Sequence, residues 1–291
     1  MKVLFATDGS DPAQAAAELL ARVADKSRVE LSVMSVTHSG MPELEEAPFL
    51  LDPIEARREN TLALVDHWTA WFQDQGFHSS AKVAEGRPGQ EIVRAVEDDW
   101  FDLTVLGSGR SSWLGQRLLG SVSTHVLHSS PSSVLIVHHA KLGPDIPRLL
   151  VAVDGSRGCE FAARAATGMT VPSAKIRVVS CFAPVTAFMV PGAVGSIPVV
   201  SGDSYDKAMS TAERRAAHFA DEFRTAGYET ETAAVWGHPH EQILKETESF
   251  GADIVVVGSR GLGPLKRALL GSVSDQVVRH APATLVGRRL T

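Results

Sequence analysis

Three glycines in the second half of the chain, Gly258, Gly261 and Gly271, have a spacing that suits phosphate binding. Two residues separate the first pair, nine separate the second, and Ser272 and Ser274 follow. The glycines come after a run of β-branched residues, which predicts a strand, a glycine-rich loop and the start of a helix. Backbone N–H groups in such a loop and at a helix N-terminus attract anions. The spacing therefore predicts a phosphate or nucleotide site; the alternative is that the glycines only form turns and the serines only cap a helix.

The first half of the chain contains the same plan with one departure. Gly107, Gly120 and Ser121 stand in register, but Arg110 takes the place of the second glycine and Gly109 comes one residue early. The Arg110 side chain could block a phosphate, or its guanidinium could hold one. We therefore expect the second half to bind more tightly and leave binding in the first half open.

An internal repeat divides the chain into two domains. The hexapeptide Leu-Leu-Gly-Ser-Val-Ser occurs at 118–123 and again at 269–274. We expect domains at 1–140 and 148–291, joined by a Pro- and Gly-containing linker at 141–147.

Each half alternates strands with helices, which is typical of an α/β fold. We predict two tandem doubly wound domains, each a five-stranded parallel sheet with helices on both faces and strand order 3-2-1-4-5. The expected strands are 2–6, 28–36, 78–84, 102–106 and 133–137 in the first half and 148–153, 175–181, 229–235, 253–257 and 283–287 in the second. A long helix is predicted at 54–75, and its apolar side is expected to carry Leu62, Val65, Trp68 and Phe72. Long loops are expected at 38–53 and 183–203.

An aspartate follows the first strand of each half, Asp8 and Asp154. Ligands of open parallel sheets bind outside the carboxyl ends of the strands, where the strand order reverses. Each aspartate is therefore a candidate ligand contact. Asp154 also suits a cap for the following helix, and the two roles do not exclude each other.

The loop, the strand-end aspartate and the tandem arrangement resemble the universal stress protein family, whose ATP-binding members carry G-x2-G-x9-G-[ST]. Residues 258–272 fit that pattern, and the resemblance covers nearly the whole chain. It implies ATP as the ligand, with Mg²⁺ carried in by the phosphates, and adenosine near Asp154 and the backbone of Cys181. The side chain of Cys181 is expected to be an ordinary small residue and not a reactive thiol.

The resemblance implies the following nucleotide-binding residues. In the second half they are Val153, Asp154, Cys181, Val257, Gly258, Arg260, Gly261, Gly271, Ser272, Val273 and Ser274. In the first half they are Thr7, Asp8, Val36, Leu106, Gly107, Gly109, Arg110, Gly120, Ser121, Val122 and Ser123.

Composition excludes several other classes of protein. The net charge of −6 and pI near 6.0 argue against a nucleic-acid-binding protein. No apolar run approaches the roughly 20 residues that span a bilayer. The two cysteines, Cys159 and Cys181, fit no metal or disulfide pattern, and His238-Pro239-His240 lacks further metal ligands. A cytoplasmic protein is the simplest expectation.

The sequence favours a regulatory binding protein over an enzyme. It contains no Walker lysine loop and no GxSxG elbow. Slow ATP hydrolysis or autophosphorylation, and a scaffold without nucleotide, are the alternatives. The last strands, 134–137 and 283–286, are expected to pair within the chain as an internal pseudo-dimer. A homodimer and an unidentified regulatory protein partner remain open.

Overall fold

The computed structural model describes residues 1–38, 51–109, 119–140, 146–182, 202–259 and 270–288. Most of the two predicted long loops lies outside these ranges, as do Arg110, Arg260 and Gly261. Where the predicted loops are described, His38 ends a strand, and residues 51–53 and 202–203 begin helices.

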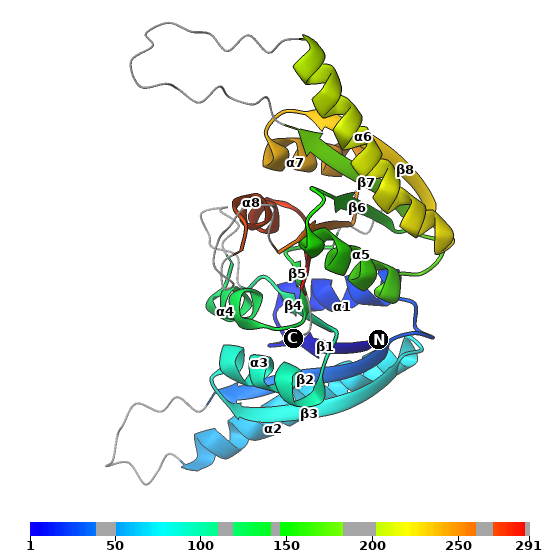
Figure 1. The fold of residues 1–291 in the computed structure, drawn as a ribbon. Coiled ribbons are helices and arrows are strands. Elements are labelled where there is room, and N and C mark those ends of the chain that lie inside the picture. The colour runs from blue at the N-terminus through cyan, green and yellow to red at the C-terminus, as the bar shows by residue number, and fades with distance from the viewer. Residues whose placement is uncertain (39–50, 110–118, 141–145, 183–201, 260–269, 289–291) are drawn as a thin grey trace, which may run out of the picture.

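The first half follows the predicted alternation of strands and helices (Figure 1). Its elements are β1 (Lys2–Ala6), α1 (Asp11–Val23), β2 (Glu30–His38), α2 (Leu51–Asp74), β3 (His78–Gly86), α3 (Pro88–Asp99), β4 (Leu103–Gly107), α4 (Ser121–Ser129) and β5 (Ser133–Val137).

The second half repeats this order element by element. It contains β6 (Arg148–Ala152), α5 (Arg157–Met169), β7 (Lys175–Phe182), α6 (Gly202–Thr225), β8 (Glu229–Trp236), α7 (Pro239–Phe250), β9 (Ile254–Gly258), α8 (Ser272–His280) and β10 (Ala283–Gly287).

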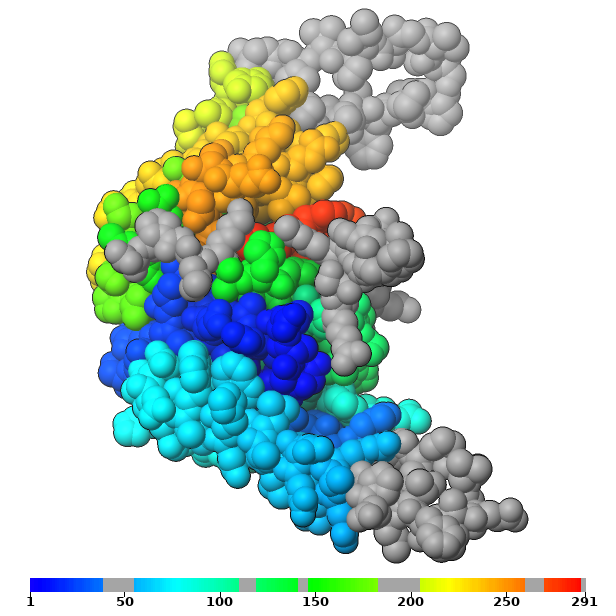
Figure 2. Space-filling view, turned by 180° about the vertical axis from the view of Figure 1, so that it is seen from behind, coloured from blue at the N-terminus to red at the C-terminus, as the bar shows by residue number. Residues whose placement is uncertain are grey.

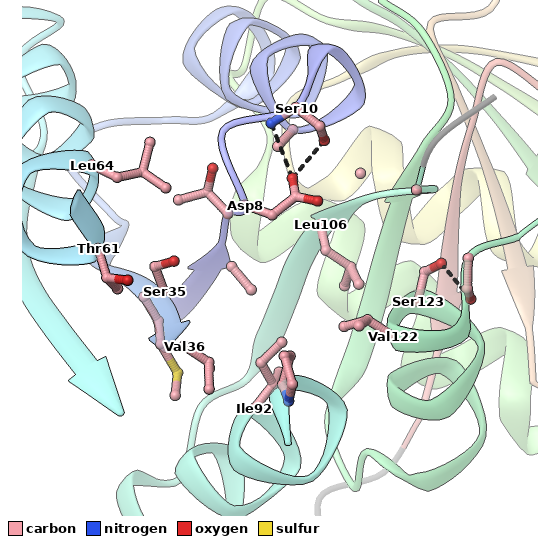
Figure 3. Close-up of a pocket in the computed structure, with 18 of the residues that line it drawn as sticks. Asp8, Ser10, Ser35, Val36, Thr61, Leu64, Ile92, Leu106, Val122 and Ser123 are labelled. Carbon is pink, nitrogen blue, oxygen red and sulfur yellow. Dashed lines mark hydrogen bonds between the residues drawn. The ribbon is translucent and has the colours of Figure 1, made fainter. Parts of the chain in front are cut away.

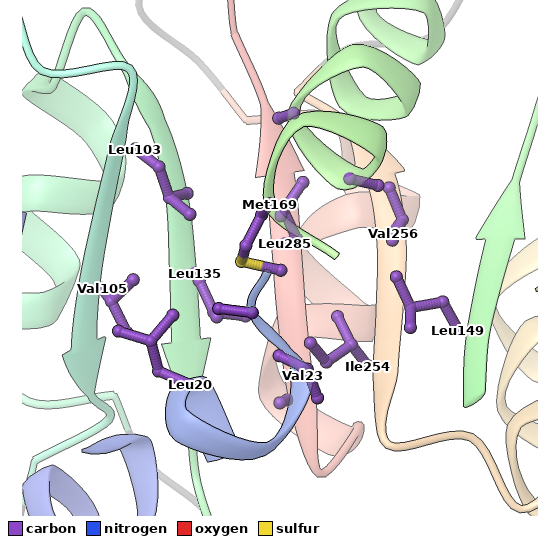
Figure 4. Close-up of a cluster of buried hydrophobic side chains, with 14 of the residues drawn as sticks. Leu20, Val23, Leu103, Val105, Leu135, Leu149, Met169, Ile254, Val256 and Leu285 are labelled. Atoms are coloured by element: carbon purple, nitrogen blue, oxygen red, sulfur yellow. The ribbon is translucent and has the colours of Figure 1, made fainter. Parts of the chain in front are cut away.

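The described strands form one sheet in the order β3-β2-β1-β4-β5-β10-β9-β6-β7-β8. Within each half all pairings are parallel and the order is 3-2-1-4-5, which confirms the predicted fold class. The halves meet where β5 pairs with β10 in antiparallel register, with Leu135 opposite Leu285 (Figure 4). The last strands are therefore paired within the chain, and neither presents a free edge at this junction.

Helices cover both faces of the sheet because strand residues alternate between two apolar clusters. One cluster joins Phe5 and its same-face neighbours to α1, α2, α5 and α6. The other joins Leu4 and its same-face neighbours to α3, α4, α7 and α8. Figure 2 shows the outcome from behind: an elongated molecule whose two halves lie end to end. None of the described helices is both long enough and apolar enough to span a bilayer.

The predicted apolar side of α2 is correct except at Leu62. Val65, Trp68 and Phe72 are buried, and the rings of Trp68 and Phe72 both contact Phe5 of β1. Leu62 is 44% exposed. At 100° per residue it lies at the margin of the stripe that the other three define, and there the helix turns toward solvent.

Candidate functional site

A cavity of about 520 Å³ lies at the carboxyl ends of β1, β2 and β4 in the first domain (Figure 3). Its volume is in the range of small-molecule sites. Ten of the residues predicted for this half line it: Thr7, Asp8, Val36, Leu106, Gly107, Gly109, Gly120, Ser121, Val122 and Ser123. Arg110, the eleventh, lies outside the described residues. The sheet thus brings together residues that are more than a hundred positions apart in the sequence, such as Thr7 and Ser123.

Asp8 and Asp154 shape the turns that follow the first strand of each domain. Asp8 Oδ1 accepts hydrogen bonds from the Ser10 N–H at 3.0 Å and from the Ser10 hydroxyl at 2.5 Å. Asp154 Oδ1 accepts from the Ser156 N–H at 2.9 Å and from the Cys159 thiol at 3.1 Å. Each aspartate therefore stabilises the turn before the following helix. The N-cap residues are Ser10 and Ser156, and neither helix has a side-chain hydrogen bond at its cap, so the capping prediction for Asp154 was wrong. Asp8 lines the cavity, where it can contact a ligand.

The opposite end of the cavity is a helix N-terminus. Gly120 occupies the N-cap position of α4, and Gly271 the same position of α8; neither helix has a side-chain hydrogen bond at its cap. The first N–H groups of an α-helix have no partner within the helix, so a glycine cap leaves them for a ligand. Ser121 and Ser272, the next residues, are exposed. This arrangement can hold an anion.

Two of the predicted serines have a different role. The Ser274 hydroxyl donates to the Gly258 carbonyl at 2.6 Å, and the Ser123 hydroxyl donates to the Ser108 carbonyl at 2.8 Å. Both serines are buried. These hydrogen bonds hold the helix start against the end of the preceding strand and the residue after it, so the hydroxyl proton of Ser274, predicted to contact the nucleotide, is directed at a carbonyl instead. The spacing of glycines and serines does not reveal these contacts, because each carbonyl acceptor lies 15 or 16 residues earlier in the chain.

The glycines at the strand ends are required by packing. A Cβ on Gly107 would lie 2.6 Å from the Pro12 carbonyl carbon, and one on Gly258 would lie 2.8 Å from that of Gly158. Each strand end therefore meets the backbone of α1 or of α5. At Gly109 the φ of +95° and the 2.8 Å from an added Cβ to the Gly120 Cα both require glycine.

The second domain places equivalent residues in equivalent positions. Thr7 N–H donates to the Met34 carbonyl in the first domain, and Val153 N–H donates to the Val179 carbonyl in the second, both at 2.9 Å. Asp154, Cys181, Val257, Gly258 and Gly271 thus occupy the positions of Asp8, Val36, Leu106, Gly107 and Gly120. The loop with Arg260 and Gly261 lies outside the described residues.

Several cavity residues were missed by the sequence analysis. Asn60, Thr61 and Leu64 come from α2, and Pro88 and Ile92 come from α3. Pro88 and Ile92 recur in the second half as Pro239 and Ile243, so the repeat itself was a usable signal. For the α2 residues the signal was weak, because nothing in the sequence shows that the middle of this helix reaches over the ends of β1 and β2.

The thiols are held in their neutral form. Burial raises the pKa of Cys181 from 9.0 to about 12, with a smaller contribution from the charge of Glu246. Burial, followed by the charge of Asp154, raises the pKa of Cys159 to about 11. This suits ordinary packing residues and not reactive thiols. Among the described residues no group of three or more His, Cys, Asp or Glu could hold a metal ion.

The tandem doubly wound sheet with a cavity at its strand ends defines a class of α/β proteins that bind ligands at the switch point of the sheet. The model of the universal stress protein family matches residues 1–138 and 146–286. The chain therefore belongs to this family and carries two of its domains.

Two similar proteins match nearly the whole chain, and a third matches about half of it. A universal stress protein of Mycolicibacterium smegmatis is 26% identical over 293 residues, which cover 96% of this chain and 94% of the relative. The crystal structure of a universal stress protein from Archaeoglobus fulgidus is 24% identical, with a TM-score of 0.68, and the match covers 99% of this chain and 98% of that chain. A universal stress protein in complex with cAMP is 27% identical, with a TM-score of 0.38, over 48% of this chain and 98% of that chain.

Proposed function

We propose that the protein binds ATP at the strand-end site of each domain, with higher affinity in the second, and acts as a stress-response regulator. The observation that carries this proposal is the cavity of about 520 Å³ that extends from Asp8 to the uncapped N-terminus of α4. A helix N-terminus suits the phosphates. The remaining cavity then takes the nucleoside. The second domain keeps the complete G-x2-G-x9-G-S pattern, which supports tighter binding there.

The proposal is binding without fast turnover. Among the described residues that line the cavity, Asp8 is the one carboxylate, and its Oδ1 already accepts two hydrogen bonds. The described lining thus offers neither paired carboxylates for a metal nor a separate general base. Mg²⁺ would be held mainly by phosphates and water. ATPase rates of about 1–1000 per second would instead favour the enzyme alternative.

The cellular setting belongs to the same proposal. Both cysteines are free thiols in the structure. This supports a reducing, cytoplasmic environment.

Extraction of the purified protein, with identification of the released nucleotide by mass spectrometry, gives the first test of the ligand.

A matched pair of variants tests each site separately. Ser121→Glu and Ser272→Glu place a carboxylate at the start of α4 and of α8, where it repels phosphate but suits the helix dipole, so folding should be preserved. Each change should weaken ATP binding at its own site at least tenfold in isothermal titration. Ser121→Glu should leave the tighter site, that of the second domain, intact. Unchanged binding in both variants would contradict the site, and a tighter site remaining in Ser272→Glu would reverse the proposed preference.

A further inference from the structure

The wall residue that the middle of α2 contributes changes from apolar to charged between the two domains. Leu64 lines the first cavity from α2, and Arg215 occupies the equivalent position of α6. Each lies thirteen residues after the first residue of its 24-residue helix. The repeat thus replaces an apolar side chain by a guanidinium at the same place.

Both side chains lie over the glycine that follows the strand-end aspartate. An added Cβ on Gly9 would lie 3.1 Å from Leu64 Cδ1, and one on Gly155 would lie 3.1 Å from Arg215 Nε. The two glycines have nearly the same φ, +73° and +81°. The Arg215 side chain therefore points in the same direction as that of Leu64, toward the ends of the first two strands of its domain.

The guanidinium of Arg215 has a hydroxyl partner and no carboxylate partner in the described part of the chain. Its Nη1 donates to the Ser180 hydroxyl at 3.1 Å, and Ser180 is fully buried at the end of β7. No described carboxylate oxygen lies within 4.0 Å of it. Asp154, the nearest strand-end acid in sequence to Gly155, instead accepts from Ser156 and Cys159. A half-buried guanidinium with no counter-ion among the described residues leaves donors for a ligand.

The cavity geometry shows which part of a ligand Arg215 would meet. In Figure 3, Leu64 and Thr61 lie on the side of the cavity opposite Val122 and Ser123 at the start of α4. If the helix start holds phosphate, the Leu64 side holds the base. In the second domain that side carries Arg215.

We propose that Arg215 determines base specificity in the second domain by shifting selection toward 6-oxopurine nucleotides, relative to the first domain. Guanine and hypoxanthine present two adjacent acceptors, O6 and N7, to a guanidinium fork, whereas adenine places an amino donor beside N7. Leu64 offers no donor to either base. The inference rests on the proposed nucleotide site and adds a difference in ligand class between its two copies.

The test measures ATP and ITP affinities of the full chain with one site silenced. In the Ser121→Glu background, Arg215→Leu should weaken ITP binding about tenfold more than ATP binding, the scale of one bidentate base contact. Arg215→Lys keeps the charge without the fork, so it should not restore ITP binding. In the Ser272→Glu background, Leu64→Arg should improve ITP binding relative to ATP.

The outcomes separate this inference from the proposed function. If ATP binds and the ratio of ATP to ITP affinities is unchanged within twofold in Arg215→Leu, base selection by Arg215 is wrong. If Arg215→Lys has the same ratio of ATP to ITP affinities as the chain that keeps Arg215, the charge alone selects the base, and recognition by the guanidinium fork is wrong. If neither nucleotide binds in either background, the proposed function fails as well. If Arg215→Leu does not fold, the ratio of ATP to ITP affinities in Leu64→Arg decides. An unchanged ratio in that variant overturns the inference.

Discussion

Cys159 and Cys181 stand beside the second site at positions that Ala13 and Val36 hold beside the first. Their raised pKa values, about 11 and about 12, come mainly from burial, which disfavours the thiolate. The second site thus carries two thiols where the first carries apolar side chains, and these thiols behave as neutral packing groups.

These pKa values predict slow thiol chemistry in the native protein. At pH 8 a pKa of about 11 in place of 9.0 leaves roughly a hundredfold less thiolate, so labelling by Ellman's reagent should be at least that much slower than in denaturant. Because the folded state keeps its thiol protons above pH 9, where the unfolded chain loses them, the free energy of unfolding should fall as pH rises from 9 toward 12.

The repeat supplies the matched control for the thiols. Cys159→Ala combined with Cys181→Val copies the first domain and should flatten this part of the pH profile. Fast labelling of native protein at pH 8, or an identical profile in the double variant, would contradict buried neutral thiols.

At the scale of elements, helices approach strands closely at glycines. A Cβ on Gly287 at the end of β10 would lie 2.2 Å from the Cα and the N of Ala162 in α5. Both contacts are with backbone, which cannot rotate away. The helix and the strand end are therefore held at a separation that only glycine permits.

This close approach predicts a large cost for one methyl group. Gly287→Ala should lower the free energy of unfolding by about 3 kcal/mol or more through overpacking, measured by urea denaturation. Gly168→Ala is the control of opposite sign. Its Cβ would meet only the flexible Met1 sulfur at 3.3 Å, and alanine favours a helix over glycine by up to about 1 kcal/mol. Equal effects of the two changes would contradict the packing argument.

At the scale of the molecule, contacts between the two domains extend beyond the β5–β10 pairing. Arg288 donates to the Ser130 carbonyl at 2.9 Å beyond the end of α4, and His138 Nε2 lies 2.6 Å from the Val278 carbonyl near the end of α8. The residue after each last strand thus contacts the helix end of the other domain. Asp253 lies within the same interface and forms an ion pair with Arg22 of α1.

Removing the interdomain carboxylate should destabilise the whole chain. Asp253→Ala removes the ion pair with the mostly buried Arg22 and the acceptor of the Arg148 N–H at 2.8 Å. The expected loss is about 3 kcal/mol, measured by denaturation of the full chain. Asp98→Ala removes an exposed i,i+4 pair with Arg94 and should cost about 0.5 kcal/mol or less. A loss at Asp253 no larger than at Asp98 would contradict this role.

The sequence by itself determined the fold class, the tandem repeat and the family, because strand and helix periodicities and the spaced glycines are local patterns. It also indicated Asp8, Gly107 and Gly120, which share a cavity because parallel strands align their carboxyl ends at one edge.

Tertiary structure alone decided what depends on contacts between distant segments. The Ser274 hydroxyl donates a hydrogen bond to the Gly258 carbonyl, Leu62 faces solvent, and Arg215 lies over Gly155 beside Ser180. No local pattern records these contacts, because each depends on how a helix packs against a sheet formed by residues far away in the chain.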